Sequence, residues 1–171
     1  MIALIPARSG SKGVSNKNIK LLDGIHLLGH SILTAQKIKG IREIIVSTDS
    51  EEYAEIARGY GAITPFLRPK EISNDSSTDF EFFKHFSDNF DLLKDELILH
   101  LRPTTPIRSI EVINDAIEKI TRDKNATSLR SGHLAPESPF KWFKKDENDY
   151  FKPLIESLTS NDINNPRQSF E

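Results

Sequence analysis

The first eighteen residues place a buried-type strand directly before a turn of small and basic residues, and this restricts the fold more than any other feature of the sequence. Residues 2–5 form the continuous apolar run that is typical of a central strand covered on both faces. Because Pro6 cannot donate to a central ladder, the strand ends there. We therefore expect an α/β sheet whose first strand leads straight into a ligand-binding loop.

The turn after this strand has the composition of a phosphate-binding loop. Its small residues let the backbone approach a ligand closely: Ala7, Ser9, Gly10, Ser11 and Gly13. Arg8, Lys12 and Lys17 supply the positive charge that a phosphate chain requires. The turn matches neither the P-loop nor the dinucleotide-binding motif, so we expect loop and side-chain groups, without a helix dipole, to hold the phosphates. A solvated basic loop is the alternative interpretation.

The overall composition narrows the class of protein. At 171 residues the chain is long enough for a proper core, and we expect a single domain over residues 1–171. A net charge of -2 argues against a nucleic-acid binder or a membrane-surface binder. The absence of cysteine from the sequence excludes disulfides and thiolate catalysis. The sequence has no signal-like or membrane-spanning apolar stretch, so the expected location is the cytoplasm.

Strand and helix signals alternate along the chain. After the first strand, further strands are predicted at residues 42–47, 62–67, 96–101 and 126–130. Helices are predicted at residues 31–39, from Thr48 or Asp49 to Gly59 or Gly61, at residues 79–90, and from the cap Ser109 through Ile120. Such alternation predicts a mostly parallel sheet with helices on both faces, a three-layer α/β/α fold.

Polar loops follow four of these strands, at residues 5–13, 47–49, 66–69 and 102–108. Ligands of parallel sheets bind beyond the carboxyl ends of the strands, so we expect the four loops to form one site. Asp75 and Asp79 are interpreted as a polar turn leading into a helix N-terminus. The five histidines are interpreted as structural or surface residues. His26 and His30 are four apart but flank a Leu-Leu-Gly stretch before the predicted helix, and the other three have no paired spacing.

The regular alternation stops after the fifth predicted strand. Residues 140–155 are typical of two extended arms around a polar turn at residues 146–149. Aromatic side chains are unusually frequent in this polar stretch: Trp142, Phe143, Tyr150 and Phe151. We interpret residues 140–155 as a dimerisation arm, and an ordinary solvent-facing hairpin is the alternative.

Five motifs follow one another along the whole chain. They are I-P-A-R-S-G-S-K-G-V-S-N-K-N at residues 5–18, V-S-T-D at 46–49, P-F-L-R-P at 65–69, P-T-T-P-I-R at 103–108 and P-R-Q at 166–168. In order and spacing they resemble the acylneuraminate cytidylyltransferases, the CMP-sialic acid synthetase family. The resemblance implies a nucleotide-diphospho-sugar transferase fold, CTP as cosubstrate with Mg²⁺, an acidic nine-carbon sugar as acceptor, and a homodimer.

The resemblance also assigns residues to ligands. The catalytic cations that it places against the triphosphate are Arg8, Lys12 and Lys17. The nucleotide contacts that it implies are Ala7, Ser9, Gly10, Asn18, Arg68, Ser77 and Thr78. We expect the sugar contacts to be Arg102, Thr104, Arg108 and Gln168. Arg102 or Arg108 is the expected partner of the sugar carboxylate.

Two departures from the family pattern bear on the function. Many members carry Gln where this sequence has Arg102, so a legionaminic- or pseudaminic-type acid is an alternative acceptor. Members also continue past the P-R-Q motif into an acidic segment that holds Mg²⁺, and we expect this chain to lack it. The metal ligands are therefore unassigned. Asp49 is the nearest substitute, a helix N-cap role explains it equally well, and the CTP phosphates would hold most of the metal.

Two other functions stay open at this stage. A Kdo cytidylyltransferase shares the P-A-R opening and the CTP chemistry, but the longer match at residues 9–18 favours the sialic-acid branch. A non-catalytic fragment would bind CTP without releasing pyrophosphate. A hydride-transferring enzyme is disfavoured because the dinucleotide-binding motif is absent from the sequence.

Overall fold

The computed structural model describes residues 1–11, 13–132 and 139–157. The chain divides into two compact units, Met1–Thr127 and Ser128–Glu171. Each unit is described by itself. The expectation of a single domain over residues 1–171 stays a prediction, because part of the second unit lies outside the described residues.

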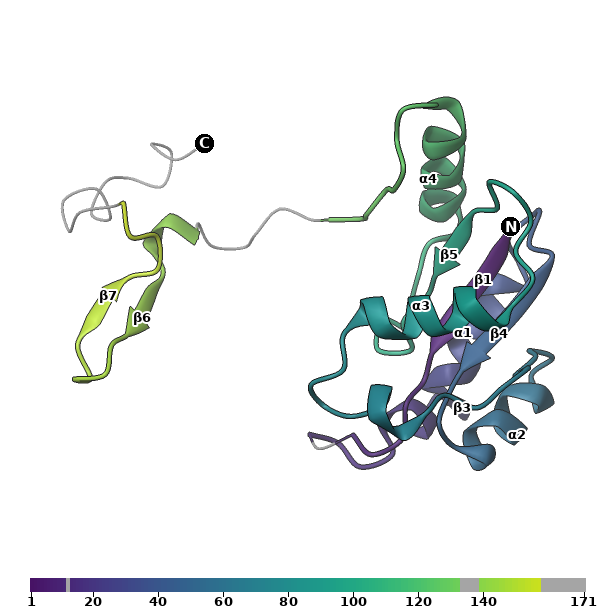
Figure 1. Ribbon diagram of the computed structural model, residues 1–171, viewed down its shortest axis with the longest axis horizontal. Helices are drawn as coiled ribbons and strands as arrows, with labels where there is room; N and C mark the ends of the chain where they lie inside the picture. The colour runs from purple at the N-terminus through teal and green to yellow at the C-terminus, as the bar shows by residue number, and fades with distance from the viewer. Residues whose placement is uncertain (12, 133–138, 158–171) are drawn as a thin grey trace. The chain divides into compact units, whose positions relative to one another are not determined.

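A three-stranded parallel sheet forms the centre of the first unit, in the order β4-β1-β5 (Figure 1). Its strands are β1 (Ile2–Pro6), β4 (Glu43–Ser47) and β5 (Ile98–His100). Residue Ile2 of β1 is in register with Glu43 on one side and with Ile98 on the other. Residues 2–5 have no exposed surface, and Pro6 is the last residue of the strand. The prediction of a central first strand that ends at the proline is confirmed.

Helices cover both faces of this sheet. Alternate residues of β1 point to opposite faces, so Ala3 and Ile5 join one core and Ile2 and Leu4 join the other. The first core contains residues of α1 (Leu27–Ala35) and α2 (Glu51–Gly59), and the second contains residues of α3 (Asp79–Asn89). Through Ile113, α4 (Ile110–Arg122) also packs against the first core. The predicted three-layer α/β/α fold is confirmed.

The helix starts are set by side-chain caps that the sequence predicted in part. Ser109 accepts a hydrogen bond from the Val112 N–H at the start of α4, as predicted. At the start of α2 the cap is Ser50, which follows the two predicted caps, Thr48 and Asp49. Helix α1 lies four residues closer to the N-terminus than the predicted 31–39, because the chain already turns after β3 at His26.

Two predicted strands are wrong. Within residues 62–67 only Ile63 pairs with the sheet, through a single parallel bridge to Ile45, because Pro65 cannot continue the ladder. Residues 126–130 form no strand and are mostly exposed, since no neighbouring strand in the described part of the chain pairs with them. The sequence also gave no sign of a small antiparallel pair, β2 (Leu21–Leu22) with β3 (Ile25–His26).

The remaining regular elements of the first unit are two short 3-10 helices. These are η1 (Lys17–Ile19) and η2 (Lys70–Ile72). They end the turn after β1 and begin the loop before α3, so both lie in segments for which the sequence predicted ligand contacts. No helix among the described residues is long and apolar enough to span a bilayer.

Within residues 139–157, the second unit forms a β-hairpin preceded by the 3-10 helix η3 (Pro139–Lys141). Strands β6 (Phe143–Lys145) and β7 (Phe151–Pro153) pair in antiparallel register, which confirms the predicted hairpin. Its aromatic side chains are largely exposed: Trp142, Phe143, Tyr150 and Phe151. Their role as a dimerisation surface stays a prediction.

Candidate functional site

The turn after β1 is held against the end of β4. The Ala7 N–H donates to the Ser47 carbonyl at 2.9 Å, which extends the β1–β4 ladder by one bond. Ala7 is fully buried, whereas Gly10 is exposed at the tip of the turn. Gly10 has a φ of +67°, a left-handed conformation that residues with a Cβ rarely adopt. The glycine is therefore required by the shape of the turn.

The side chains of Asp49 and Asn18 hold the backbone of this turn by hydrogen bonds. The Asp49 carboxylate accepts hydrogen bonds from the Ser9 N–H and the Ser9 hydroxyl, both at 2.7 Å. The Asn18 amide donates to the Arg8 carbonyl at 2.9 Å, and Asn18 is buried. Asn18 is one of the residues predicted to contact the nucleotide. In the structure its amide group binds the backbone of the turn.

Arg8 lines an open hollow of about 530 Å³ at the carboxyl end of the sheet. The other lining residues are Gly10 from the same turn and Ser73, Asn74, Asp75 and Ser76 from the loop before α3. The Arg8 guanidinium donates to the Asp75 carboxylate at 2.5 Å, and both side chains keep about a third of their surface exposed. The turn after β1 and the loop before α3 therefore line the same hollow, and Arg8 is the cation among its lining residues.

Arg68 lies beneath the turns and is almost fully buried. Its backbone N–H donates to the Thr48 carbonyl at 2.7 Å and its guanidinium donates to the Ser47 carbonyl at 2.9 Å. The guanidinium also stands over the Phe82 ring, 5.6 Å from its centre. Burial lowers the pKa of Arg68, while the negative charge of Asp49 opposes this shift.

The loop after β5 brings two further predicted residues to the same end of the sheet. Arg102 forms an ion pair with Asp79, the first residue of α3, and both side chains are about half exposed. Arg108 donates to the Ser31 hydroxyl at 3.2 Å and to the Arg102 carbonyl. Burial lowers the pKa of Arg108. Arg102 thus has a half-exposed guanidinium paired with Asp79, and Arg108 holds the loop that carries it.

Ser77 and Thr78, two other predicted contacts, form hydrogen bonds within the loop before α3 and at the start of that helix. The Ser77 hydroxyl accepts from the Asn74 N–H at 3.0 Å. Thr78 forms a capping box with Glu81 at the start of α3. Thr104 is exposed, and Lys17 is partly exposed where it opens η1. Lys12 and Gln168 lie outside the described residues, as does the P-R-Q motif.

A dedicated metal centre is absent from the described residues, where no three Asp, Glu or His side chains gather to hold an ion. Both oxygens of Asp49, the substitute ligand considered above, already accept hydrogen bonds from Ser9. Asp49 is not the N-cap of α2 either, since Ser50 takes that role. The described residues therefore provide no ready-made cluster of protein ligands for Mg²⁺.

The histidines of the described residues make structural contacts. His26 contacts the Tyr60 hydroxyl at 3.0 Å, and His30 contacts the Leu22 carbonyl at 2.8 Å. His85 stacks edge-on against Phe66, and His100 packs against Phe82 and Phe83. Burial lowers the pKa of His85, with the charge of Arg68 adding to the effect. These contacts agree with the structural interpretation, and His133 lies outside the described residues.

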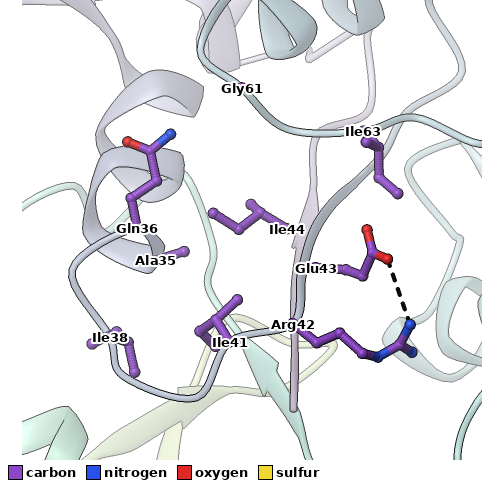
Figure 2. Close-up of a pocket in the computed structure, with 9 residues that line it drawn as sticks. All are labelled: Ala35, Gln36, Ile38, Ile41, Arg42, Glu43, Ile44, Gly61 and Ile63. Carbon is purple, nitrogen blue, oxygen red and sulfur yellow. Dashed lines mark hydrogen bonds and ion pairs between the residues drawn. The ribbon is translucent and has the colours of Figure 1, made fainter.

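A second, smaller cavity of about 230 Å³ lies beside β4, between the end of α1 and the segment at Gly61 (Figure 2). Its walls include Ala35, Ile38, Ile41 and Ile44, and Arg42 and Glu43 form an ion pair at its side. It borders the first residues of β4, whereas the predicted loops leave the last residues of the strands. None of its lining residues belongs to the four predicted loops.

The sequence missed the acidic partners of the site. Asp75 lies in the predicted polar turn and Asp79 begins α3, as interpreted from the sequence, and the two carboxylates also pair with Arg8 and Arg102. Asp49 was considered for a metal or a helix cap, and it binds Ser9. The sequence places acidic residues near these cations, but only the fold shows which carboxylate meets which cation.

The family comparison agrees with this geometry. Residues 2–151 match the family model described as cytidylyltransferase. The chain belongs to the cytidylyltransferase family.

Relatives of this cytidylyltransferase chain include two enzymes of acidic-sugar activation. It is 38% identical over 142 residues to CMP-N,N'-diacetyllegionaminic acid synthase of Legionella pneumophila, a match that covers 80% of this chain and 60% of the relative. It is 42% identical over 119 residues to N-acylneuraminate cytidylyltransferase of Escherichia coli O18:K1:H7, covering 69% of this chain and 27% of the relative. The chain thus matches only part of the length of each.

Solved structures support the fold. The CTP complex of CMP:2-keto-3-deoxy-manno-octonic acid synthetase superposes with a TM-score of 0.60 at 17% identity, over 71% of this chain and 47% of that one. At this identity the likeness shows the fold of the cytidylyltransferase chain and not its substrate. The parallel sheet with helices on both faces is the shared feature.

Proposed function

We propose that this chain carries the nucleotide-binding part of a CTP-dependent cytidylyltransferase that makes a CMP-activated acidic nine-carbon sugar and releases pyrophosphate. The single observation that carries the proposal is the turn after β1, where Arg8 faces an open hollow and Ser9 and Gly10 are held in a fixed conformation. In a chain of the cytidylyltransferase family, a cation and small residues at the carboxyl end of the central strand suit a triphosphate.

The reaction requires charge neutralisation more than covalent chemistry. The anomeric hydroxyl of the sugar attacks the α-phosphorus of CTP, a new P–O bond forms, the bond to the bridging oxygen breaks, and pyrophosphate leaves as the hydroxyl loses its proton. Arg8 can donate two parallel hydrogen bonds to phosphoryl oxygens, and Lys12 and Lys17 act as point charges. Their task is to hold the phosphates in line and to stabilise the charge that moves onto pyrophosphate.

The paired state of Arg8 is compatible with this role. Its partner Asp75 is partly exposed, so water can solvate the carboxylate when a phosphate takes its place. A triphosphate carries more negative charge than one carboxylate and binds the same guanidinium more strongly. The Arg8–Asp75 pair would therefore exchange for an Arg8–phosphate pair when CTP binds.

Arg102 is the better candidate for the sugar carboxylate. Its guanidinium is about half exposed and pairs with the half-exposed Asp79 carboxylate, whereas Arg108 is partly buried and donates to Ser31 and to the Arg102 carbonyl. We propose an acidic sugar of the sialic or legionaminic type, because the relatives named above are synthases of CMP-activated acids of these two kinds. Ser77, Thr78 and Thr104 stay proposed ligand contacts, as do Lys12 and Gln168.

Further parts of the proposal concern the cofactor, assembly and location. Mg²⁺ would come with CTP, held by phosphate oxygens and water, since the described residues supply no metal cluster. A homodimer would form through the exposed aromatic residues of the β6–β7 hairpin. The cytoplasm, where CTP is made, would be the location of the reaction.

Pyrophosphate release tests the function. The purified chain, with CTP and Mg²⁺, is offered sialic, legionaminic and pseudaminic acids and Kdo, and pyrophosphate is measured for each. The proposal predicts release with one of the nine-carbon acids. Release with Kdo alone would assign the rival activity, and CTP binding by calorimetry without release from any acid would leave a nucleotide-binding chain without catalysis.

A further inference from the structure

The contact between Asp49 and Ser9 joins two loops that are far apart in the sequence. Each carboxylate oxygen of Asp49 accepts one hydrogen bond, Oδ1 from the Ser9 N–H and Oδ2 from the Ser9 hydroxyl, both at 2.7 Å. Ser9 stands between Arg8, which faces the hollow, and Gly10, which forms the tip of the turn. Because both neighbours are covalently attached to Ser9, fixing this residue limits how far the turn can move.

The start of α2 leaves Asp49 available for this contact. Ser50 caps the helix by accepting from the Tyr53 N–H. The Thr48 hydroxyl accepts from the Ser50 N–H at 3.2 Å, so the segment before the helix is already shaped by its own polar groups. The carboxylate of Asp49 is thus not needed by the helix and extends to the neighbouring turn.

Arg68 holds the backbone segment that carries Asp49. Its two hydrogen bonds, to the carbonyls of Ser47 and Thr48, hold the two residues that precede Asp49. Its buried positive charge interacts favourably with Asp49 and unfavourably with Arg8. A carboxylate next to a phosphate-binding turn would by itself repel the ligand. The buried guanidinium of Arg68 and the two donors of Ser9 offset the negative charge of Asp49.

We propose that Asp49 is a positioning residue of the anion-binding turn, which acts through Ser9 and touches neither the nucleotide nor a metal. The inference rests on the proposed function, since it says how the same turn is kept ready for the triphosphate. Its physical basis is preorganisation: a turn already held in its binding conformation loses less entropy when the ligand arrives.

Calorimetry on four variants tests the positioning role. The probes are CTP and inorganic tripolyphosphate, both in EDTA so that no metal contributes. Asp49→Asn keeps the shape but replaces one acceptor oxygen with a donor, and we expect affinity for both probes to fall about tenfold. Ser9→Ala removes the hydroxyl but keeps the N–H contact, and a smaller loss is expected. The double variant should lose no more than Asp49→Asn alone, because both changes remove the same contact.

Glu55→Gln is the matched control, because it removes an equal charge from an exposed position of α2. We expect it to bind both probes like the original chain. The melting temperature of each variant shows whether the fold is kept, and Ser9→Ala serves as the milder change should Asp49→Asn unfold. With an active acceptor, Asp49→Asn should raise the KM for CTP and leave the Mg²⁺ concentration for half-maximal rate unchanged.

Three results would overturn the inference: unchanged probe affinity in a folded Asp49→Asn variant, additive losses in the double variant, or a raised Mg²⁺ requirement, which would make Asp49 a metal ligand. The proposed function fails differently. If the original chain binds tripolyphosphate but releases no pyrophosphate with any acid, catalysis is refuted while the role of Asp49 is still measured. If the original chain binds neither probe, both proposals are wrong.

Discussion

The charged side chains at the two ends of the central sheet differ in their exposure to water. At the amino end, the Glu96 carboxylate has only 2% of its side chain exposed and binds the Arg42 guanidinium at 2.9 and 3.1 Å and the Met1 amine at 3.2 Å. At the carboxyl end, Arg8 pairs with Asp75 and Arg102 pairs with Asp79, and all four side chains are between 30% and 56% exposed. At the amino end the Glu96 carboxylate is shielded from water although its partner Arg42 is 37% exposed, whereas at the carboxyl end both members of each pair are open to water.

This difference separates charges that stabilise the fold from charges that can change partner. Glu96 joins the starts of β1 and β4, and its hydrogen bonds with Arg42 lower its pKa to about 2, against the opposing effect of burial. Removing a partner there leaves a shielded charge unpaired, which is costly. An exposed pair contributes little to stability, so a ligand can replace one of its members at small cost.

The largest expected effect follows from removing the cation at the open end. Arg8→Ala should lower kcat/KM for CTP by two to three orders of magnitude, roughly 3 to 4 kcal/mol of lost transition-state stabilisation, with little change in melting temperature. Pyrophosphate release and thermal unfolding measure the two. Arg58→Ala is the control, because Arg58 also forms an exposed ion pair, with Glu51 of α2, but lies outside the site. An equal loss of kcat/KM in Arg58→Ala would contradict the role assigned to Arg8.

A change at the shielded end should affect stability and not binding. Glu96→Gln should lower the melting temperature at pH 7, because the pKa of Glu96 is depressed from 4.5 to about 2 in the folded chain. Such a carboxylate stabilises the fold above about pH 4.5, and this contribution is lost as the pH falls toward 2. The difference in melting temperature between the Glu96→Gln variant and the original chain should therefore shrink as the pH falls from about 4.5 toward 2. Unfolding scans from pH 7 to 2 check it, with exposed Glu118→Gln as the control.

The two arginines of the loop after β5 should behave differently from each other. Arg102→Ala is expected to raise the KM for the acceptor sugar about tenfold, the loss of one charged hydrogen bond, while the KM for CTP stays the same. Arg108→Ala should instead lower the melting temperature, because its guanidinium holds the loop through Ser31 and the Arg102 carbonyl. Steady-state kinetics with each substrate varied in turn would show the split, and a raised CTP KM in Arg102→Ala would contradict the assignment.

The smallest effect is expected from the carboxylate that competes with phosphate. Asp75→Asn should tighten CTP binding by up to about fivefold, because an exposed ion pair of less than about 1 kcal/mol no longer has to be broken. Calorimetric titration of the folded variant with CTP measures this. Weaker binding would mean that Asp75 organises the hollow and does not compete for Arg8.

Local sequence patterns were sufficient for much of the fold. The apolar run at residues 2–5 predicted the central strand, Ser109 and the isoleucines after it predicted α4, and the polar turn at 146–149 predicted the hairpin. Each signal lies within a few residues of the element that it specifies. Residues 62–67 show the limit of such signals, since an apolar run pairs over its length only where a neighbour offers a free edge and no proline intervenes.

The sequence by itself determined where β1 and β4 end and which loops carry cations and small residues, because strand periodicity, proline and glycine act locally. The tertiary structure alone decided the partners of those cations. Ser9 and Asp49 are 40 residues apart, and Arg8 and Asp75 are 67 apart. No local pattern relates residues at such separations. They meet because parallel strands release their loops at the same edge of the sheet, and close approach then selects which charge neutralises which.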